Sequence, residues 1–231
     1  MKASDSGKHK GSMKITSEIF QVGGGRLSSP EDAAIYLIAF ADQAALVDAG
    51  CGNSTKKVVA NIQAFVTIEK IRYLLLTHCH FDHTGGAKAL RDLSGCKIVA
   101  HELDAQFLED GDEEVTAASW YGQSMEPLSI DVKLTGDRNE IELSGRTIEA
   151  IHIPGHSPGS LVYLVESEGQ KVVFAQDVHG PLHPSLLSNR EDYLRSLDRL
   201  LSLDADILCE GHYGVFRGKK EVVELIHRFI P

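Results

Sequence analysis

Short apolar runs alternate with polar turns and amphipathic stretches along most of the chain. In the first half, β-branched and apolar runs that end at Gly, Asp or polar residues predict strands at 15–22, 33–40, 44–47, 71–76 and 97–100. Helical spacing predicts helices at 53–65 and 87–93, and another that begins at 101. The second half repeats this order, with strands at 132–134, 141–143, 147–151, 161–166, 171–175 and 206–209 and helices at 190–201 and 219–229.

The pattern predicts one domain preceded by a short N-terminal tail. Residues 1–12 are small and polar, and they predict a flexible N-terminal segment ahead of Met13. No linker-like stretch divides the remainder, and both halves contribute candidate site residues. We therefore expect a single domain over residues 13–231.

Three histidines and one carboxylate lie within six residues after the predicted strand 71–76. If His78 and His80 continue the extended chain, their side chains point to the same side and can bind one metal ion. Asp82 and His83 follow the bend and can face a second ion. Imidazole and carboxylate groups suit zinc, iron or manganese. Four potential ligands at this spacing favour a metal site over a polar surface turn.

Three later segments carry residues of the same chemistry. His156 lies in Pro154-Gly155-His156-Ser157-Pro158-Gly159, where prolines and glycines form a rigid turn that would fix the imidazole. Asp177 follows the strand 171–175, and His212 follows the strand 206–209 within Glu210-Gly211-His212-Tyr213-Gly214.

These motifs, in this order, resemble those of the metallo-β-lactamase-fold superfamily of metallohydrolases, in its glyoxalase II-like branch. The resemblance covers the chain from about residue 13 and implies an α/β fold of the α+β type, a four-layer αββα sandwich with ligands in loops at one edge. It implies that the first metal is bound by His78, His80 and His156, and the second by Asp82, His83 and His212. It also implies that Asp177 bridges two divalent ions, with zinc expected first and iron or manganese as alternatives.

The resemblance implies a binuclear hydrolase that acts on a small molecule. A metal-bridging hydroxide would cleave an ester-like bond (thioester, lactone or other ester), and Asp82 would orient this nucleophile and return a proton. A mononuclear-iron persulfide dioxygenase shares much of the motif and is one alternative; a non-catalytic metal-binding module is another. Ser160 replaces a histidine common in glyoxalase II-like members, and no C-terminal helical domain follows, so we expect a compact hydrolase.

Several other residues have two interpretations. In the resembling family an acidic residue at Asp48 orients a metal-bound histidine, whereas an Asx-turn or helix cap is the structural alternative. Trp120 and Tyr121 either line a substrate pocket or fix the irregular segment 109–130 to the body.

The remaining histidines and Tyr213 receive structural or weaker functional roles. His179 and His183 are expected in loops, where either residue can contact substrate or protonate a leaving group. Tyr213 is a candidate substrate contact. His101 is expected at the surface or as a helix cap, and His152 as a packing residue.

The composition restricts the expected binding partners and the expected cellular compartment of the protein. The net charge of −10 disfavours a nucleic-acid partner, because phosphate binding needs a basic face. No apolar run is long enough to span a bilayer. The cysteines lack C-x-x-C spacing and predict reduced thiols in a cytoplasmic protein; Cys79, between two proposed ligands, is expected to pack in the core. The oligomeric state stays open, a dimer included.

Overall fold

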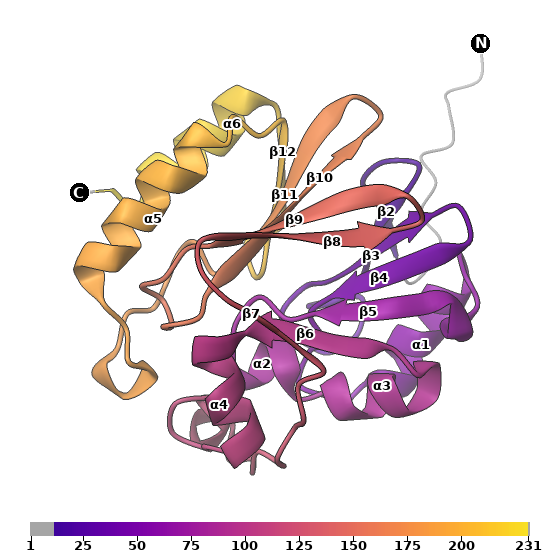
Figure 1. Cartoon of the computed structure of the whole chain (residues 1–231), viewed down its shortest axis with the longest axis horizontal. Helices are drawn as coiled ribbons and strands as arrows, with labels where there is room; N and C mark the ends of the chain where they lie inside the picture. The colour runs from indigo at the N-terminus through magenta and orange to yellow at the C-terminus, as the bar shows by residue number, and fades with distance from the viewer. Residues whose placement is uncertain (1–11, 231) are drawn as a thin grey trace.

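The structure, a computed structural model in which residues 12–230 are described, has two β-sheets between two layers of helices (Figure 1). The first sheet has its strands in sequence order: β1 (Met13–Lys14), β2 (Ile19–Gly23), β3 (Ile35–Phe40), β4 (Gln43–Val47), β5 (Ile71–Leu75), β6 (Lys97–His101) and β7 (Val132–Leu134). Neighbours from β1 to β4 are antiparallel, and those from β4 to β7 are parallel.

The second sheet has the order β13-β12-β11-β10-β9-β8. Its strands are β8 (Arg138–Leu143), β9 (Arg146–His152), β10 (Leu161–Ser167), β11 (Gln170–Gln176), β12 (Ile207–Glu210) and β13 (Val215–Arg217). Only the pair β11 and β12 is parallel; the other described neighbours in this sheet are antiparallel. Because parallel strands end at the same edge, this pair delivers Asp177 and His212 side by side.

Helices cover the outer face of each sheet (Figure 1). Those beside the first sheet are α1 (Thr55–Gln63), α2 (Phe81–Thr84), α3 (Ala87–Ser94) and α4 (Glu102–Asp110). Those beside the second sheet are α5 (Arg190–Ser202) and α6 (Lys219–His227). Short 3-10 helices occur at η1 (Ile68–Lys70), η2 (Ala118–Tyr121) and η3 (Pro184–Leu186).

Side-chain alternation along the strands explains the four layers. In β3, Leu37 packs in the same cluster as Val58 and Ile62 of α1. Its neighbours Tyr36 and Ile38 point the other way, into a cluster that contains Tyr163 and Phe174 of the second sheet. The expected αββα sandwich of the α+β type is therefore confirmed.

Several expected element boundaries are wrong. The strand expected at 15–22 begins only at Ile19, and the strand expected at 71–76 ends at Leu75. The segment from Thr77 to His80 is therefore a loop and does not continue the strand. Strand β13 and the three 3-10 helices were not expected.

Most of the predicted N-terminal tail, residues 1–11, lies outside the described residues, whereas its last residue, Ser12, is buried. None of the described helices is both long and apolar enough to cross a membrane.

Candidate metal centre

All seven residues predicted as ligands meet at one edge of the sandwich. One group contains His78, His80, His156 and Asp177, and a second contains Asp82, His83 and His212. Within each group the candidate ligand atoms lie within 4.8 Å of one another. The structure thus brings the predicted residues together.

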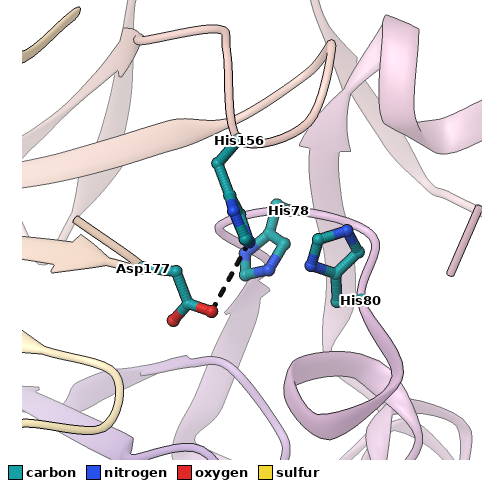
Figure 2. A group of neighbouring side chains, drawn as sticks. All are labelled: His78, His80, His156 and Asp177. Atoms are coloured by element: carbon teal, nitrogen blue, oxygen red, sulfur yellow. Dashed lines mark ion pairs between the residues drawn. The ribbon is translucent and has the colours of Figure 1, made fainter. Parts of the chain in front are cut away.

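The first group has the chemistry of a metal site. The ring centroids of its three histidines are 4.4–4.8 Å apart, and Figure 2 shows these rings gathered beside Asp177. The Nε2 atoms of His78, His80 and His156 are buried and have no hydrogen-bond partner. Buried polar atoms are almost always paired. Three converging unpaired nitrogens therefore fit a bound cation.

Asp177 lies between the two groups. Its Oδ2 is 3.4 Å from Nε2 of His156 (Figure 2). Its Oδ1 is 3.2 Å from Nε2 of His83 and 3.4 Å from Nε2 of His212. Each carboxylate oxygen therefore faces a different group, which is the arrangement that a bridging carboxylate requires.

The second group is built around a short helix and the final loop. Asp82 and His83 lie on α2, and Oδ2 of Asp82 is 3.1 Å from Nε2 of His212 and 3.7 Å from Nε2 of His83. His83 is fully buried, whereas about a third of the His212 side chain is exposed. Of the two groups, the second is therefore the more accessible from solvent.

Asp48 fixes the orientation of His83. Its Oδ2 is 2.7 Å from Nδ1 of His83, and the same carboxylate accepts hydrogen bonds from the backbone N–H and hydroxyl of Thr77. With Nδ1 engaged in this way, Nε2 of His83 is directed at the site. The expectation that Asp48 orients a site histidine is confirmed as to geometry.

Asp104 connects the two loops that carry the first group, a role that the sequence did not indicate. This buried carboxylate accepts hydrogen bonds from the backbone N–H of Cys79 at 2.8 Å and of Gly159 at 2.6 Å, and from the hydroxyl of Ser157 at 2.6 Å. Cys79 lies between His78 and His80, and Ser157 follows His156. Asp104 therefore positions both loops relative to each other.

Burial and neighbouring charges set the protonation of the centre. Burial, together with nearby imidazoles, holds the pKa values of His78 and His80 well below the usual range, so both rings are neutral. Although burial opposes it, the surrounding carboxylates raise the pKa of His83 well above its usual range. Burial also opposes protonation of His212, but its close contacts with the carboxylates of Asp177 and Asp82 raise its pKa to about 10.

The two site carboxylates are ionised. Burial works against this, but the charge of His83 and the close contacts of Asp177 with the imidazoles of His156, His212 and His83 lower the pKa of Asp177 well below its usual range. Burial also acts to raise the pKa of Asp82, but the neighbouring His83 and His212 outweigh it, so the pKa of Asp82 is lowered. Two anionic groups among neutral and titratable imidazoles make a site that attracts cations.

A cavity of about 270 Å³ lies directly beside the centre. Its walls include Trp120, Tyr121, Pro181 and Leu186. The pocket-lining alternative for Trp120 and Tyr121 therefore agrees with the structure. Tyr121 also packs against Phe81, with ring centroids 5.7 Å apart, so it fixes its segment to the body as well.

His179 lies closer to the centre than a simple loop residue. It lines the 270 Å³ cavity and forms a third candidate ligand group with Asp177 and His212. Its Nδ1 is 2.7 Å from Oε1 of the buried Glu210, a partner that sequence reasoning missed. The position of Glu210 at the end of β12, one residue before the Gly-His pair, was the available signal.

Two other candidates, His183 and Tyr213, belong to neither ligand group. The ring of His183 is 5.4 Å from that of Trp120, and His183 caps η3. Tyr213 is 58% exposed, packs against His179 and is absent from the walls of the 270 Å³ cavity.

His101 takes one of its two expected roles, that of a helix cap. It caps α4, where its Nδ1 accepts a hydrogen bond from the N–H of Leu103, but it is buried and not at the surface. Its ring stacks on that of His152, with centroids 4.0 Å apart, so His152 is a packing residue as expected. Cys79 is fully buried in the apolar cluster of the first sheet, also as expected.

The fold and the site together define a class, that of αββα proteins with a His- and Asp-rich metal centre at one edge of the sandwich. The chain belongs to the metallo-beta-lactamase superfamily, whose family model matches residues 29–212. The resemblance of the sequence motifs to this superfamily is thereby confirmed.

Two relatives share about 30% identity with part of this chain. The probable metallo-hydrolase MJ0888 of Methanocaldococcus jannaschii is 31% identical over 43% of this chain and 47% of its own length. The acyl-coenzyme A thioesterase MBLAC2 of Homo sapiens is 29% identical over 67% of this chain and 60% of its own length. The matched stretch thus spans about half to three fifths of these two proteins.

A solved structure supports the same family assignment. The metallo-beta-lactamase with a HARLDQ motif from Cronobacter sakazakii superposes with a TM-score of 0.75 at 26% identity, over 87% of this chain and 78% of that one. The expectation of a hydrolase from this superfamily agrees with these names.

Proposed function

We propose that the chain is a binuclear metal-dependent hydrolase that cleaves a thioester, lactone or other ester of a small molecule. The observation that carries this proposal is the position of Asp177, whose two oxygens face two different groups of buried nitrogens. His78, His80 and His156 would hold one ion, and the second would be held by Asp82, His83 and His212. Zinc is the proposed metal because imidazoles dominate both groups.

A pair of divalent ions supplies an acidified water and stabilises negative charge on the substrate carbonyl oxygen. The chain supplies orientation and proton handling. Asp82, ionised beside His212, would accept a hydrogen bond from the attacking water, take up its proton and return it to the leaving thiolate or alkoxide as the acyl bond breaks. Burial, with Asp82 close by, raises the pKa of the Tyr121 hydroxyl, so this group remains a hydrogen-bond donor at the cavity wall.

The relatives support a hydrolase and favour an ester-type bond. One is named a probable metallo-hydrolase and another an acyl-coenzyme A thioesterase, both at about 30% identity. The substrate is proposed to be a small molecule, because the cavity lined by residues of both ligand groups has a volume of about 270 Å³. A cytoplasmic location is proposed from four cysteines that are all free and buried.

Elemental analysis of protein purified without added metal tests this proposal, followed by a panel of thioesters, lactones and carboxylic esters. We expect about two metal equivalents per chain and turnover of at least one ester class. Asp177→Asn should lose one equivalent, because an amide offers only one oxygen ligand. The exposed Asp92→Asn is the matched control.

Other outcomes would contradict the proposal in distinguishable ways. About one iron per chain, with oxygen uptake in the presence of a persulfide, would indicate the dioxygenase instead. Two bound metals without turnover of any ester would indicate a non-catalytic metal-binding module. No metal uptake on reconstitution would refute the site itself.

A further inference from the structure

A second, larger cavity adjoins the metal centre. It has a volume of about 580 Å³, and His212 belongs to its wall as well as to that of the 270 Å³ cavity. The rest of the wall comes from Ser12 and Met13, from Gln21 of β2, from the loop 24–34 and from the segment 211–214. A substrate whose reactive bond lies at the centre therefore has room for one arm in each cavity.

The two cavities differ in chemistry. The smaller one presents Trp120, Tyr121, Pro181 and Leu186, which suit an apolar or aromatic group. The larger one contains Arg26, the only lysine or arginine in the wall of either cavity. Arg26 is exposed and has no hydrogen bond or ion pair with any residue among 12–230. An arginine without a protein partner is available to a ligand.

The turn that carries Arg26 is held in place from both sides. The N–H of Gly24 donates to the hydroxyl of Ser28 at 2.7 Å, and the N–H of Leu27 donates to the carbonyl of Gly24 at 2.9 Å. Asn61, on α1, donates its amide to the carbonyl of Leu27 at 3.1 Å. The backbone at Arg26 is therefore fixed before any ligand binds, which lowers the entropic cost of binding.

Asp32 is the one carboxylate in the same wall, and its oxygens are already engaged. Oδ2 accepts hydrogen bonds from the hydroxyl of Ser28 at 2.5 Å and the N–H of Ser29 at 3.1 Å. Oδ1 accepts from the N–H of Cys51 at 2.9 Å. These bonds keep Asp32 in the loop, so it does not neutralise Arg26.

We propose that the substrate is a thioester with an apolar acyl group and an anionic leaving group, and that Arg26 binds the anion. The acyl group occupies the 270 Å³ cavity, and the carboxylate or phosphate oxygens of the leaving group lie in the 580 Å³ cavity. This inference rests on the proposed hydrolase function. Because the chain has a net charge of −10, its overall field repels an anion, and a local cation is needed to hold one.

Matched thioesters test this inference. S-benzoyl derivatives of ω-mercapto carboxylic acids, with one, two or three methylenes before the carboxylate, are compared with their neutral amides. Released thiol is measured for the wild-type metal-loaded protein, Arg26→Ala, Arg26→Glu and Arg72→Ala. Arg72 is exposed on β5 and lines neither cavity. Arg72→Ala removes the same charge as Arg26→Ala, so it controls for the change in net charge.

For at least one spacer length we expect the wild-type kcat/KM to favour the acid over its amide by about fivefold at low salt, the upper range for an exposed ion pair. The preference should appear as a lower KM for the acid than for the amide, and it should shrink as ionic strength rises. It should disappear in Arg26→Ala and reverse in Arg26→Glu. Arg72→Ala should retain it.

Equal rates for acid and amide in the wild type at every spacer length, or a preference that survives Arg26→Ala, would overturn the inference while leaving the hydrolase intact. If neither acid nor amide is cleaved by the metal-loaded protein, while other esters are, the thioester class is excluded and the inference fails with it. If no ester of any class is cleaved, the proposed function itself fails.

Discussion

Replacing Asp104 should weaken both the fold and the metal centre, because this carboxylate joins two ligand-bearing loops. In Asp104→Asn the single amide oxygen can replace only one of the two carboxylate oxygens. If it takes the place of Oδ2, the N–H of Gly159 faces an NH₂ group; if it takes the place of Oδ1, the N–H of Cys79 does. Either way, one buried backbone donor loses its acceptor.

The expected magnitude follows from these contacts. One unsatisfied buried N–H costs about 1–3 kcal/mol, so Asp104→Asn should lose about 2 kcal/mol of unfolding free energy. Asp104→Ala leaves both N–H groups unpaired and should lose about 2–6 kcal/mol. Burial raises the pKa of Asp104, and removal of its charge relieves part of this cost, which favours the lower end of the range.

Urea unfolding with and without chelator is the assay, since bound metal stabilises the native state separately. For a chain of this length, about 2 kcal/mol corresponds to a melting temperature lowered by about 4–8 °C. Metal titration should show weaker binding, because His80 and His156 lie on the loops that Asp104 joins. Asp92→Asn, an exposed helical carboxylate, is the control. An Asp104→Asn variant as stable as this control, with unchanged metal binding, would refute the reasoning.

Three further predictions concern the same centre. Asp48→Ala removes the partner of Nδ1 of His83 and should weaken binding of one metal equivalent about 10–100-fold in a metal titration; unchanged affinity for both equivalents would contradict it. In the metal-free protein the pKa of His212 is raised to about 10, so its contribution to stability should be complete below about pH 6.5 and vanish between about pH 6.5 and 10. Because the metal competes with this proton, apparent affinity should rise over the same window, and a flat profile would count against it. Gly159→Ala places a Cβ 2.6 Å from the backbone nitrogen of Asp104 and should cost about 1–3 kcal/mol in urea unfolding, so an unchanged midpoint would be inconsistent with this close approach.

The amino-acid sequence alone was sufficient for the class of fold and for naming seven residues that the fold brings together at one edge. Alternating apolar positions predicted most strands, because side-chain direction along a strand depends on local backbone geometry. The run from His78 to His83 indicated a metal site because several ligand types lie within a few residues. His156, Asp177 and His212 were identified by their motifs, and the structure brings them to the same edge.

Tertiary structure alone decided how the centre is supported and what surrounds it. Asp104 accepts hydrogen bonds from residues 25 and 55 positions away, and no local pattern marks such a carboxylate. His101 caps α4, one of its two expected roles, but it is buried because its ring stacks on His152, which a distant strand supplies. Arg26 is an ordinary surface residue in sequence and gains significance only because its loop forms a cavity wall with His212. In each case the decisive contact joins segments far apart in the chain, and only folding sets their distance.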